Sequence, residues 1–208
     1  MYFLEVKMKE YNIVYQKTPD WSQIEKINVD FANWVENPGI KVEAQLAWNE
    51  NELMYHGIAH EKDVRATFDA PGCEVCNDSC LEFFFMPEGD TRYINVESNP
   101  NCAIWLGIGT DMPDRIRLLL QDEKGILKMK ANRTDDGWEL FYSIPLSFMQ
   151  MFYTGYEFKT GNVLKVNLMK CGDATPKLHW LSWEPFDPEN KTFHDSKFFG
   201  KMTLVGGN

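Results

Sequence analysis

Hydrophobic and polar residues alternate with a period of two along much of the chain. In residues 41–48, valine, alanine, leucine and tryptophan occupy every second position, and lysine, glutamate and glutamine fill most positions between them. This period is typical of a half-buried β-strand. Turn-forming residues follow at 49–52, and residues 53–59 then predict the returning strand of a hairpin.

The same pattern recurs toward the C-terminus in short segments that are separated by glycine-containing turns. Further strands are predicted at residues 81–86, 92–97, 103–108, 116–120, 126–131, 138–144, 163–169, 178–183 and 199–205. Residues 61–79 have no period and contain Pro71-Gly72, so they predict a long loop, and such loops usually serve a function. Many short strands at close spacing indicate an all-β fold, an antiparallel β-sandwich.

Helical pattern is scarce. The best candidate begins at Pro145 or Ser147 and ends at Phe152, and we expect this one short helix to close an end of the sandwich. Residues 1–20 predict a lead-in and an edge strand. With 208 residues the chain can bury one substantial core, so residues 1–208 are expected to form a single domain.

The charge balance narrows the choice of partners. The chain has 21 Lys and Arg against 31 Asp and Glu, a net charge of −10, so it repels a phosphate backbone and nucleic acid is not expected as a partner. No apolar run is long enough to span a membrane, and residues 1–17 lack the apolar core of a signal peptide. Aromatic residues make up 14% of the chain, and their rings can serve either core packing or ligand stacking.

Five cysteines are present, at positions 73, 76, 80, 102 and 171. With no export signal they would meet a reducing compartment, so free thiols are expected. The spacing Cys73-x-x-Cys76-x-x-x-Cys80 suggests zinc, but a structural zinc site takes four ligands and usually a second paired group, which the sequence lacks. We interpret these residues as loop and core cysteines.

One predicted strand carries a polar face. Between residues 93 and 99, strict alternation sends Ile94 and Val96 to one side. The other side receives Tyr93, Asn95, Glu97 and Asn99. Amides and carboxylates at this spacing suit the vicinal hydroxyls of a ligand, and a solvated outer face is the alternative interpretation. Glu82, on the preceding predicted strand, can extend this face.

Residues 178–195 gather rings, carboxylates and an imidazole around a predicted loop. Trp180 and Trp183 fall on opposite strand faces, so we expect one in the core, Trp183 being favoured, and the other exposed. The carboxylates of Glu184, Asp187 and Glu189 are oxygen ligands of the kind that calcium takes. An acidic turn that contains proline and holds no metal is the alternative.

Several motifs, taken in chain order, resemble the family 9 carbohydrate-binding modules, and more closely a bacterial family-9-like branch. They are Asn77-Asp78-Ser79-Cys80-Leu81-Glu82-Phe83-Phe84-Phe85, Tyr93-x-Asn95-x-Glu97-x-Asn99, Lys170-Cys171-Gly172-Asp173, Ser182-Trp183 and Phe193-His194-x4-Phe199-Gly200. The hairpin around residues 47–53 is also similar, so the resemblance covers about residues 20–205.

This resemblance implies a β-sandwich of the DOMON type that binds sugars without catalysis and often holds structural calcium. In the family two aromatic rings clamp a sugar. The second ring matches Phe193, with Asn190 beside it, whereas the first falls near Val75, which is not aromatic. The resemblance places Glu82, His194 and the polar face in the ligand site. A mono- or oligosaccharide is the implied ligand, and Trp183 is a further candidate contact.

Two other functions remain open. A carbohydrate-active enzyme could use Glu97 with Asp173 or His194 as an acid–base pair. A haem-binding relative of the DOMON type could use ligands from Met86, Met169 and His179.

The sequence also leads to an expectation about where the protein is located. As written the sequence favours the cytoplasm, whereas a sugar-binding module whose leader had been removed would be expected outside the cell.

Overall fold

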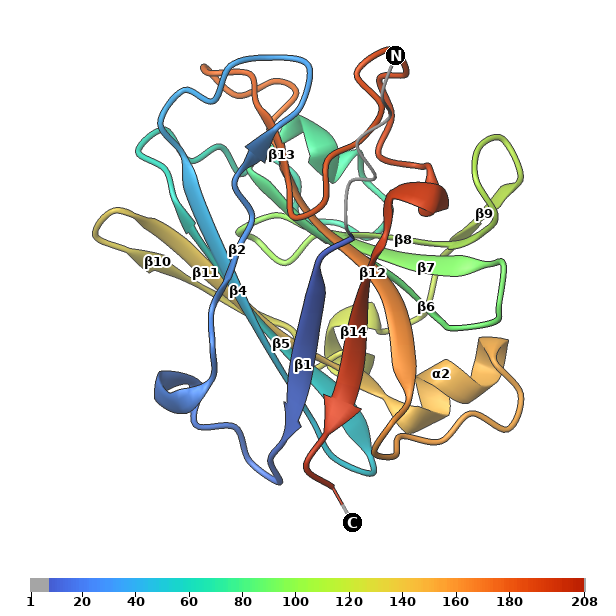
Figure 1. Cartoon of the computed structure of the whole chain (residues 1–208). Helices are drawn as coiled ribbons and strands as arrows, with labels where there is room; N and C mark the ends of the chain where they lie inside the picture. The colour runs from blue at the N-terminus through green and yellow to red at the C-terminus, as the bar shows by residue number, and fades with distance from the viewer. Residues whose placement is uncertain (1–7, 208) are drawn as a thin grey trace.

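One curled β-sheet organises the protein (Figure 1). The computed structural model describes residues 8–207, and these contain fourteen strands. In chain order they are β1 (Glu10–Tyr15), β2 (Ile27–Asn28), β3 (Phe31–Ala32), β4 (Lys41–Trp48), β5 (Glu52–His60), β6 (Cys80–Pro87), β7 (Tyr93–Ser98), β8 (Ile104–Gly109), β9 (Arg115–Leu118), β10 (Lys130–Thr134), β11 (Gly137–Pro145), β12 (Val163–Cys171), β13 (Trp180–Ser182) and β14 (Gly200–Val205).

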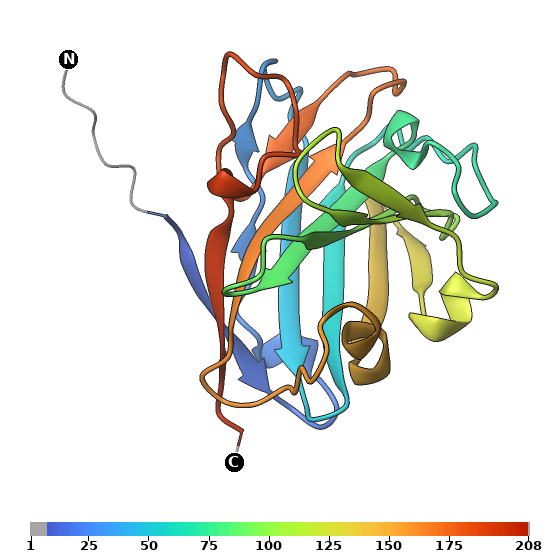
Figure 2. The ribbon, with the colours of Figure 1, turned by 90° about the vertical axis from the view of Figure 1, so that its right-hand side faces the viewer.

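The sheet folds over into two facing layers (Figure 2). Its strand order is β10-β11-β5-β4-β1-β14-β12-β6-β7-β8-β9, with β2, β3 and β13 attached at the side. The rings of Tyr55 on β5 and Phe83 on β6 stack with centroids 5.8 Å apart, which brings the two layers together across the core. The predicted β-sandwich is confirmed, and alternation explains it because each strand gives the core one apolar face.

The first strand corrects two expectations. β1 lies between β14 and β4, so it is an internal strand and not an edge strand. It pairs parallel with both neighbours, so the sheet is mixed and not purely antiparallel. Its residue Ile13 is fully buried, as this internal position leads one to expect. The first seven residues of the predicted lead-in lie outside the described residues.

Two short helices accompany the sheet in residues 8–207. The expected one is α2 (Leu146–Phe152), which buries Phe148 and Met149 near the end of β11. The other, α1 (Glu123–Ile126), lies at the start of the segment 126–131 that was predicted as a strand. The Asp122 side chain accepts a hydrogen bond from the Gly125 amide at 3.0 Å, and this N-cap favours the helical turn. The strand here, β10, begins only at Lys130.

Short 3-10 turns complete the described elements. They are η1 (Trp21–Gln23), η2 (Val75–Asn77) and η3 (Ser196–Phe198). The predicted loop 61–79 contains only η2. Among residues 8–207 no helix has the length and apolarity needed to cross a membrane.

A buried ion pair links the two layers near one end of the sandwich. Lys170 of β12 is fully buried, and its amine lies 3.2 Å from the carboxylate of Glu61, which follows β5. The same carboxylate accepts hydrogen bonds from Trp138 Nε1 at 2.7 Å and from Ser79 Oγ at 3.1 Å. The Lys170 amine also lies 2.7 Å from Nε2 of His179. Partners therefore satisfy each charged group here, as burial of charges requires.

Candidate functional site

A pocket of about 500 Å³ lies on the face of β6, β7 and β8 that points away from the core. Leu81 and Phe83 of β6 face the core, so alternation turns Glu82 to the other side. The loop residues 191–194 also line the pocket, and so do residues 112–113 and 115–117 at the start of β9. The pocket is thus built on a rigid sheet and bordered by loops, the usual arrangement of a binding site.

Four side chains form what we call the polar floor: Glu82, Asn95, Glu97 and Cys171. All four are buried and line the pocket. Glu82 pairs directly with Glu97 across β6 and β7, so the two carboxylates are neighbours. Asn95 Nδ2 donates a 2.8 Å hydrogen bond to Glu97 Oε1, and Cys171 Sγ donates one of 2.7 Å to Glu82 Oε1. Each glutamate has a second carboxylate oxygen that makes neither of these bonds, so the floor can accept further hydrogen bonds.

Arg115 of β9 fixes the floor from the side. Its guanidinium donates to Asn95 Oδ1 and, at 2.9 Å, to the carbonyl oxygen of Thr110. It also lies 3.8 Å from the centre of the Tyr93 ring. A side chain at Gly107 would not fit here, because an added Cβ would lie 2.6 Å from Asn95 Oδ1. The missing side chain on β8 therefore leaves room for the Asn95 amide.

The two floor glutamates hold their protons more tightly than ordinary carboxyls. Burial raises the pKa of Glu97 from 4.5 to about 7, against the opposing effects of the Asn95 hydrogen bond and the Arg115 charge. Burial, and then the negative charge of Glu97, raises the pKa of Glu82 well above 4.5. Near neutral pH the floor can therefore offer a carboxylic acid donor as well as carboxylate acceptors.

Aromatic rings stand on both sides of the floor. Trp105 of β8 pairs with Glu97, and Trp180 of β13 pairs with Cys171, so the carboxylates lie between two strands that each carry a tryptophan. Both rings are half-buried and line the pocket. Arg117 lies 4.1 Å from the centre of the Trp105 ring, and Trp180 Nε1 donates a 2.7 Å hydrogen bond to Asp173 Oδ1.

A third tryptophan, Trp34, reaches the pocket from the loop after β3. Its ring centre lies 5.8 Å from that of Trp180 and 5.3 Å from that of Phe193. Its backbone has φ of +57°, a conformation uncommon for a bulky residue. The ring contacts and a 2.9 Å hydrogen bond from Trp34 Nε1 to the Asp187 carbonyl hold this conformation. Strained residues of this kind concentrate at functional sites.

Comparison with known proteins identifies the family. Residues 14–204 match the model of carbohydrate-binding family 9. The chain belongs to this family. Comparison with curated protein sequences gives no significant match.

Solved structures with the same fold include family 9 modules. A candidate carbohydrate-binding protein from Bacteroides uniformis is 28% identical, with a TM-score of 0.84, over 95% of this chain and all of that one. A family 9 module from Caldicellulosiruptor kristjanssonii in complex with glucose is 12% identical, with a TM-score of 0.69, over 96% of this chain and 97% of that one. A structure of a family 9 module from the same organism in complex with cellotriose has a TM-score of 0.68 at 12% identity, over 96% of this chain and 95% of that one. The family 9 resemblance read from the motifs is confirmed.

Five of the predicted ligand residues line the pocket of this family 9 chain. They are Glu82, Asn95, Glu97, Phe193 and His194. Phe193 is only 9% exposed and packs against Phe186, with ring centres 5.2 Å apart, so it offers little surface for stacking. Tyr93 is fully buried and supports the pocket through a 2.8 Å hydrogen bond between its hydroxyl and Nδ1 of His194.

Four predicted ligand residues are not among those that line the pocket: Tyr93, and with it Asn99, Asn190 and Trp183. Asn99 follows β7 and donates to Asp78 Oδ2 at 2.8 Å, so it organises the loop 61–79. The Asn190 amide donates to the Asp187 carbonyl, in a turn before the lining residues. Trp183 is 5% exposed and packs in the interior next to Gly200. It is therefore the buried member of the pair Trp180 and Trp183, as expected.

The acidic residues that were considered for calcium do not converge. Among residues 8–207, one cluster has three metal-binding side chains whose ligand atoms lie within 4.8 Å of one another. None of these acidic residues belongs to that cluster. The carboxylate of Glu184 is buried and accepts a hydrogen bond from the Lys9 amide. Asp187 Oδ1 accepts one from the Glu189 amide at 2.9 Å, as in an acidic turn. These three side chains therefore do not fit a shared calcium ion.

The predicted haem ligands are separated. Met86 pairs with Lys165, whereas Met169 pairs with Glu82, four positions further along the same pair of strands. Four strand positions span about 13 Å. Both ring nitrogens of His179 already have partners, the Lys170 amine at 2.7 Å and the Lys177 carbonyl at 2.7 Å. These residues therefore do not form an axial ligand pair.

Sequence reasoning missed several residues of the pocket. Trp105 had a signal, because Ile104 and Leu106 on either side of it face the core and so turn its ring outward. Arg115 begins β9 one residue before the predicted strand. Trp34 had no signal, because it lies in an irregular segment after the two-residue strand β3, and only the pairing of β3 with β13 brings it to the pocket.

Proposed function

We propose that the pocket binds a mono- or oligosaccharide without catalysing its conversion. The observation that carries this proposal is the combination of a buried polar floor with tryptophans on two sides of it. A pyranose has hydroxyls at its edge and C–H groups on its faces, so it can donate to the carboxylates of Glu82 and Glu97 while it packs on a ring. Modules of the same family that contain glucose and cellotriose support the choice of ligand.

The rings that we assign to stacking differ from the expected clamp. Trp105 and Trp180 take this role in place of Phe193, because they are half-buried whereas Phe193 is buried. Asn95 and Arg115 orient the carboxylate of Glu97 and keep the floor in one geometry. Because the floor is formed before the ligand arrives, binding orders few side chains and costs little conformational entropy.

Calorimetric titration with glucose, cellotriose and a panel of neutral oligosaccharides tests the proposal. The wild type is expected to bind at least one of them at millimolar concentration or below. Trp105→Ala and Trp180→Ala are each expected to weaken binding by about tenfold or more, since the packing of the C–H face of a pyranose on a buried tryptophan ring contributes on the order of 1 kcal/mol or more. Glu97→Gln is expected to weaken it similarly without a change in shape.

Trp21→Ala is the matched control, because Trp21 is half-buried but packs on His56, away from the pocket. It is expected to bind like the wild type. The proposal fails if no sugar in the panel binds at millimolar concentration, or if the pocket variants bind as well as Trp21→Ala.

A carbohydrate-active enzyme is the second candidate function. It is favoured by the position of Glu97, whose pKa of about 7 suits a general acid, in one pocket with Asp173 and His194. Incubation with the oligosaccharides that bind, followed by a reducing-sugar assay, separates the two functions. If the protein cleaves an oligosaccharide and Glu97→Gln abolishes the cleavage, the protein is an enzyme and the proposal of non-catalytic binding fails. If an oligosaccharide binds but is not cleaved, the result supports a non-catalytic binding module.

A further inference from the structure

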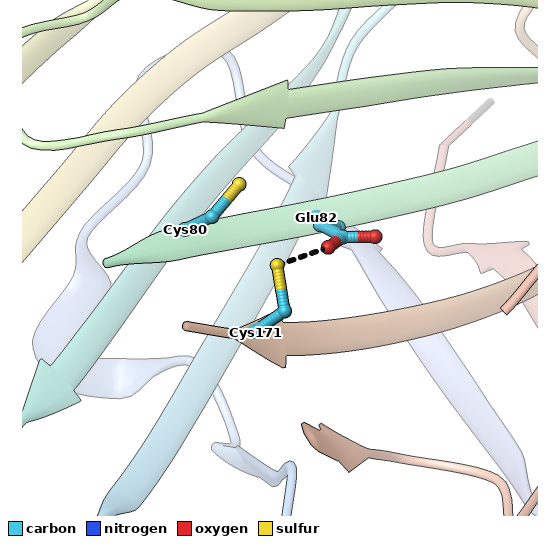
Figure 3. Close-up of side chains that lie close together, drawn as sticks. All are labelled: Cys80, Glu82 and Cys171. Carbon is cyan, nitrogen blue, oxygen red and sulfur yellow. Dashed lines mark hydrogen bonds between the residues drawn. The ribbon is translucent and has the colours of Figure 1, made fainter. Parts of the chain in front are cut away.

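Two cysteines and a glutamate meet at one end of the polar floor (Figure 3). Cys80 and Glu82 come from β6 and Cys171 comes from β12, where it pairs directly with Cys80. One ligand atom from each residue lies within 4.8 Å of the other two. All three side chains are buried, and the two sulfurs are free thiols.

The position of these residues on neighbouring strands fixes the cluster. Cys80 and Glu82 are two residues apart, so they share one face of β6, and Cys171 lies opposite across a regular antiparallel ladder. Ladder hydrogen bonds hold all three backbones. The donor atoms are therefore brought together by the sheet itself, and not by a flexible loop.

The spacing is close to that around a bound zinc ion. Zinc–sulfur bonds of about 2.3 Å and zinc–oxygen bonds of about 2.0–2.2 Å place two ligands of a tetrahedral site about 3.5–3.8 Å apart. The three ligand atoms lie within 4.8 Å of one another. Side-chain rotations that move them closer together by about 1 Å produce the geometry of a zinc site. The backbone of the sheet does not have to move.

The donor set selects the kind of ion. Two thiolates are soft ligands that favour zinc and other thiophilic ions, whereas calcium and magnesium take sets of oxygens. Among the described residues Glu82 makes no ion pair with a lysine or arginine. The nearby Lys170 amine is bonded instead to Glu61, His179 and the Cys171 carbonyl. A divalent cation that displaces the protons of the two thiols and of Glu82 would therefore supply the positive charge that no lysine or arginine among the described residues provides to Glu82.

We propose that Cys80, Glu82 and Cys171 form a binding site for a thiophilic divalent cation of the zinc class. Glu82 and Cys171 line the pocket, so the fourth coordination position of the ion faces the open space above the floor. The motif Cys73-x-x-Cys76-x-x-x-Cys80 supplies only its last residue to this site. The proposal does not depend on sugar binding, because the ion requires only the three protein ligands.

Metal titration of the full chain tests the site. The protein is reduced, freed of metal and dialysed against Zn²⁺, and bound metal is measured by elemental analysis. In a parallel sample Co²⁺ serves as the probe, because thiolate ligands give it a charge-transfer absorption. We expect one equivalent of each ion, with thiolate absorption for Co²⁺. Cys171→Ser, Cys80→Ser and Glu82→Gln are each expected to weaken Zn²⁺ binding by about 100-fold or more.

Cys102→Ser is the matched control, because Cys102 is a half-buried free thiol outside the cluster. It is expected to bind metal like the wild type. Thermal unfolding checks that each variant folds, and Glu82→Gln, which keeps the side-chain shape, decides the question if a cysteine variant does not fold. Absence of stoichiometric Zn²⁺ and Co²⁺ binding overturns the proposal. Binding that survives Glu82→Gln and Cys171→Ser, or that Cys102→Ser abolishes, also overturns it.

Discussion

At the scale of single residues, the protonation of His194 makes the stability of the protein depend on pH. Its ring stacks on Phe84, with ring centres 5.0 Å apart, and its Nδ1 lies 2.8 Å from the Tyr93 hydroxyl. Burial, and then the charge of Arg115, lowers the pKa of His194 from 6.5 to about 4. Between these two pH values the unfolded chain binds a proton that the folded chain does not, so the stabilising effect of neutral His194 is lost as pH falls.

We therefore expect His194→Phe to respond less to acid. Between pH 6.5 and pH 4, the free energy of unfolding of the wild type should fall by up to about 3 kcal/mol relative to that of the variant. Urea denaturation at several pH values measures this difference. Lys130→Ala, at an exposed position on β10, should keep the wild-type dependence. A variant whose pH dependence equals that of the wild type would contradict the assignment.

Single residues also show how far sequence reasoning reaches. Alternation alone turned Glu82, Asn95 and Glu97 away from the core, because strand geometry fixes the side on which each residue emerges. Trp34 and Phe193 illustrate the limit. Whether a ring is covered depends on loops that fold back over the sheet, and these have no period in the sequence.

At the scale of elements, the pair Lys170–Glu61 ties β12 of one layer to the end of β5 in the other. Lys170→Met leaves the buried carboxylate of Glu61 without its cationic partner, so we expect it to lower the free energy of unfolding by about 3–5 kcal/mol. The double variant Lys170→Met/Glu61→Gln should lose less of its free energy of unfolding than Lys170→Met alone. Chemical denaturation measures both.

The exposed pair Lys201–Glu88 provides the comparison, because water screens it. Lys201→Met should change the stability little. If Lys170→Met proved as mild as Lys201→Met, or if the double variant were less stable than Lys170→Met, the buried pair would not hold the layers as described.

Element prediction succeeded where both faces of a strand carry a clear pattern, as in residues 41–48 and 53–59. It failed at residues 126–129, because Ile126 ends the helix that Asp122 caps and the strand begins only at Lys130. The position of β1 was also missed. A strand's own residues indicate whether it is buried, but its neighbours are set by pairing with β14 and β4, which lie far along the chain.

At the scale of the whole molecule, the net charge of −10 makes ionic strength informative. Dissolved salt screens the field of the protein, so it changes the binding of charged ligands far more than that of neutral ones. If the ligand is a neutral sugar, its affinity should change by less than about twofold between about 0.05 M and about 0.5 M NaCl. Calorimetry at the two salt concentrations checks this. Affinity that rises steeply with salt would instead indicate an anionic ligand.

The parallel pairing of β1 with β14 bears on how the molecule is made. Residues 10–15 are synthesised well before their main partner, residues 200–205, which lie far later in the chain. Among the described residues, the other strand pairing of β1 joins two of its residues to β4. Contacts between segments so distant in the chain close slowly. The junction that β1 makes between β4 and β14 can therefore form only after residues 200–205 have been synthesised, so we expect it to be among the last parts of the sandwich to fold.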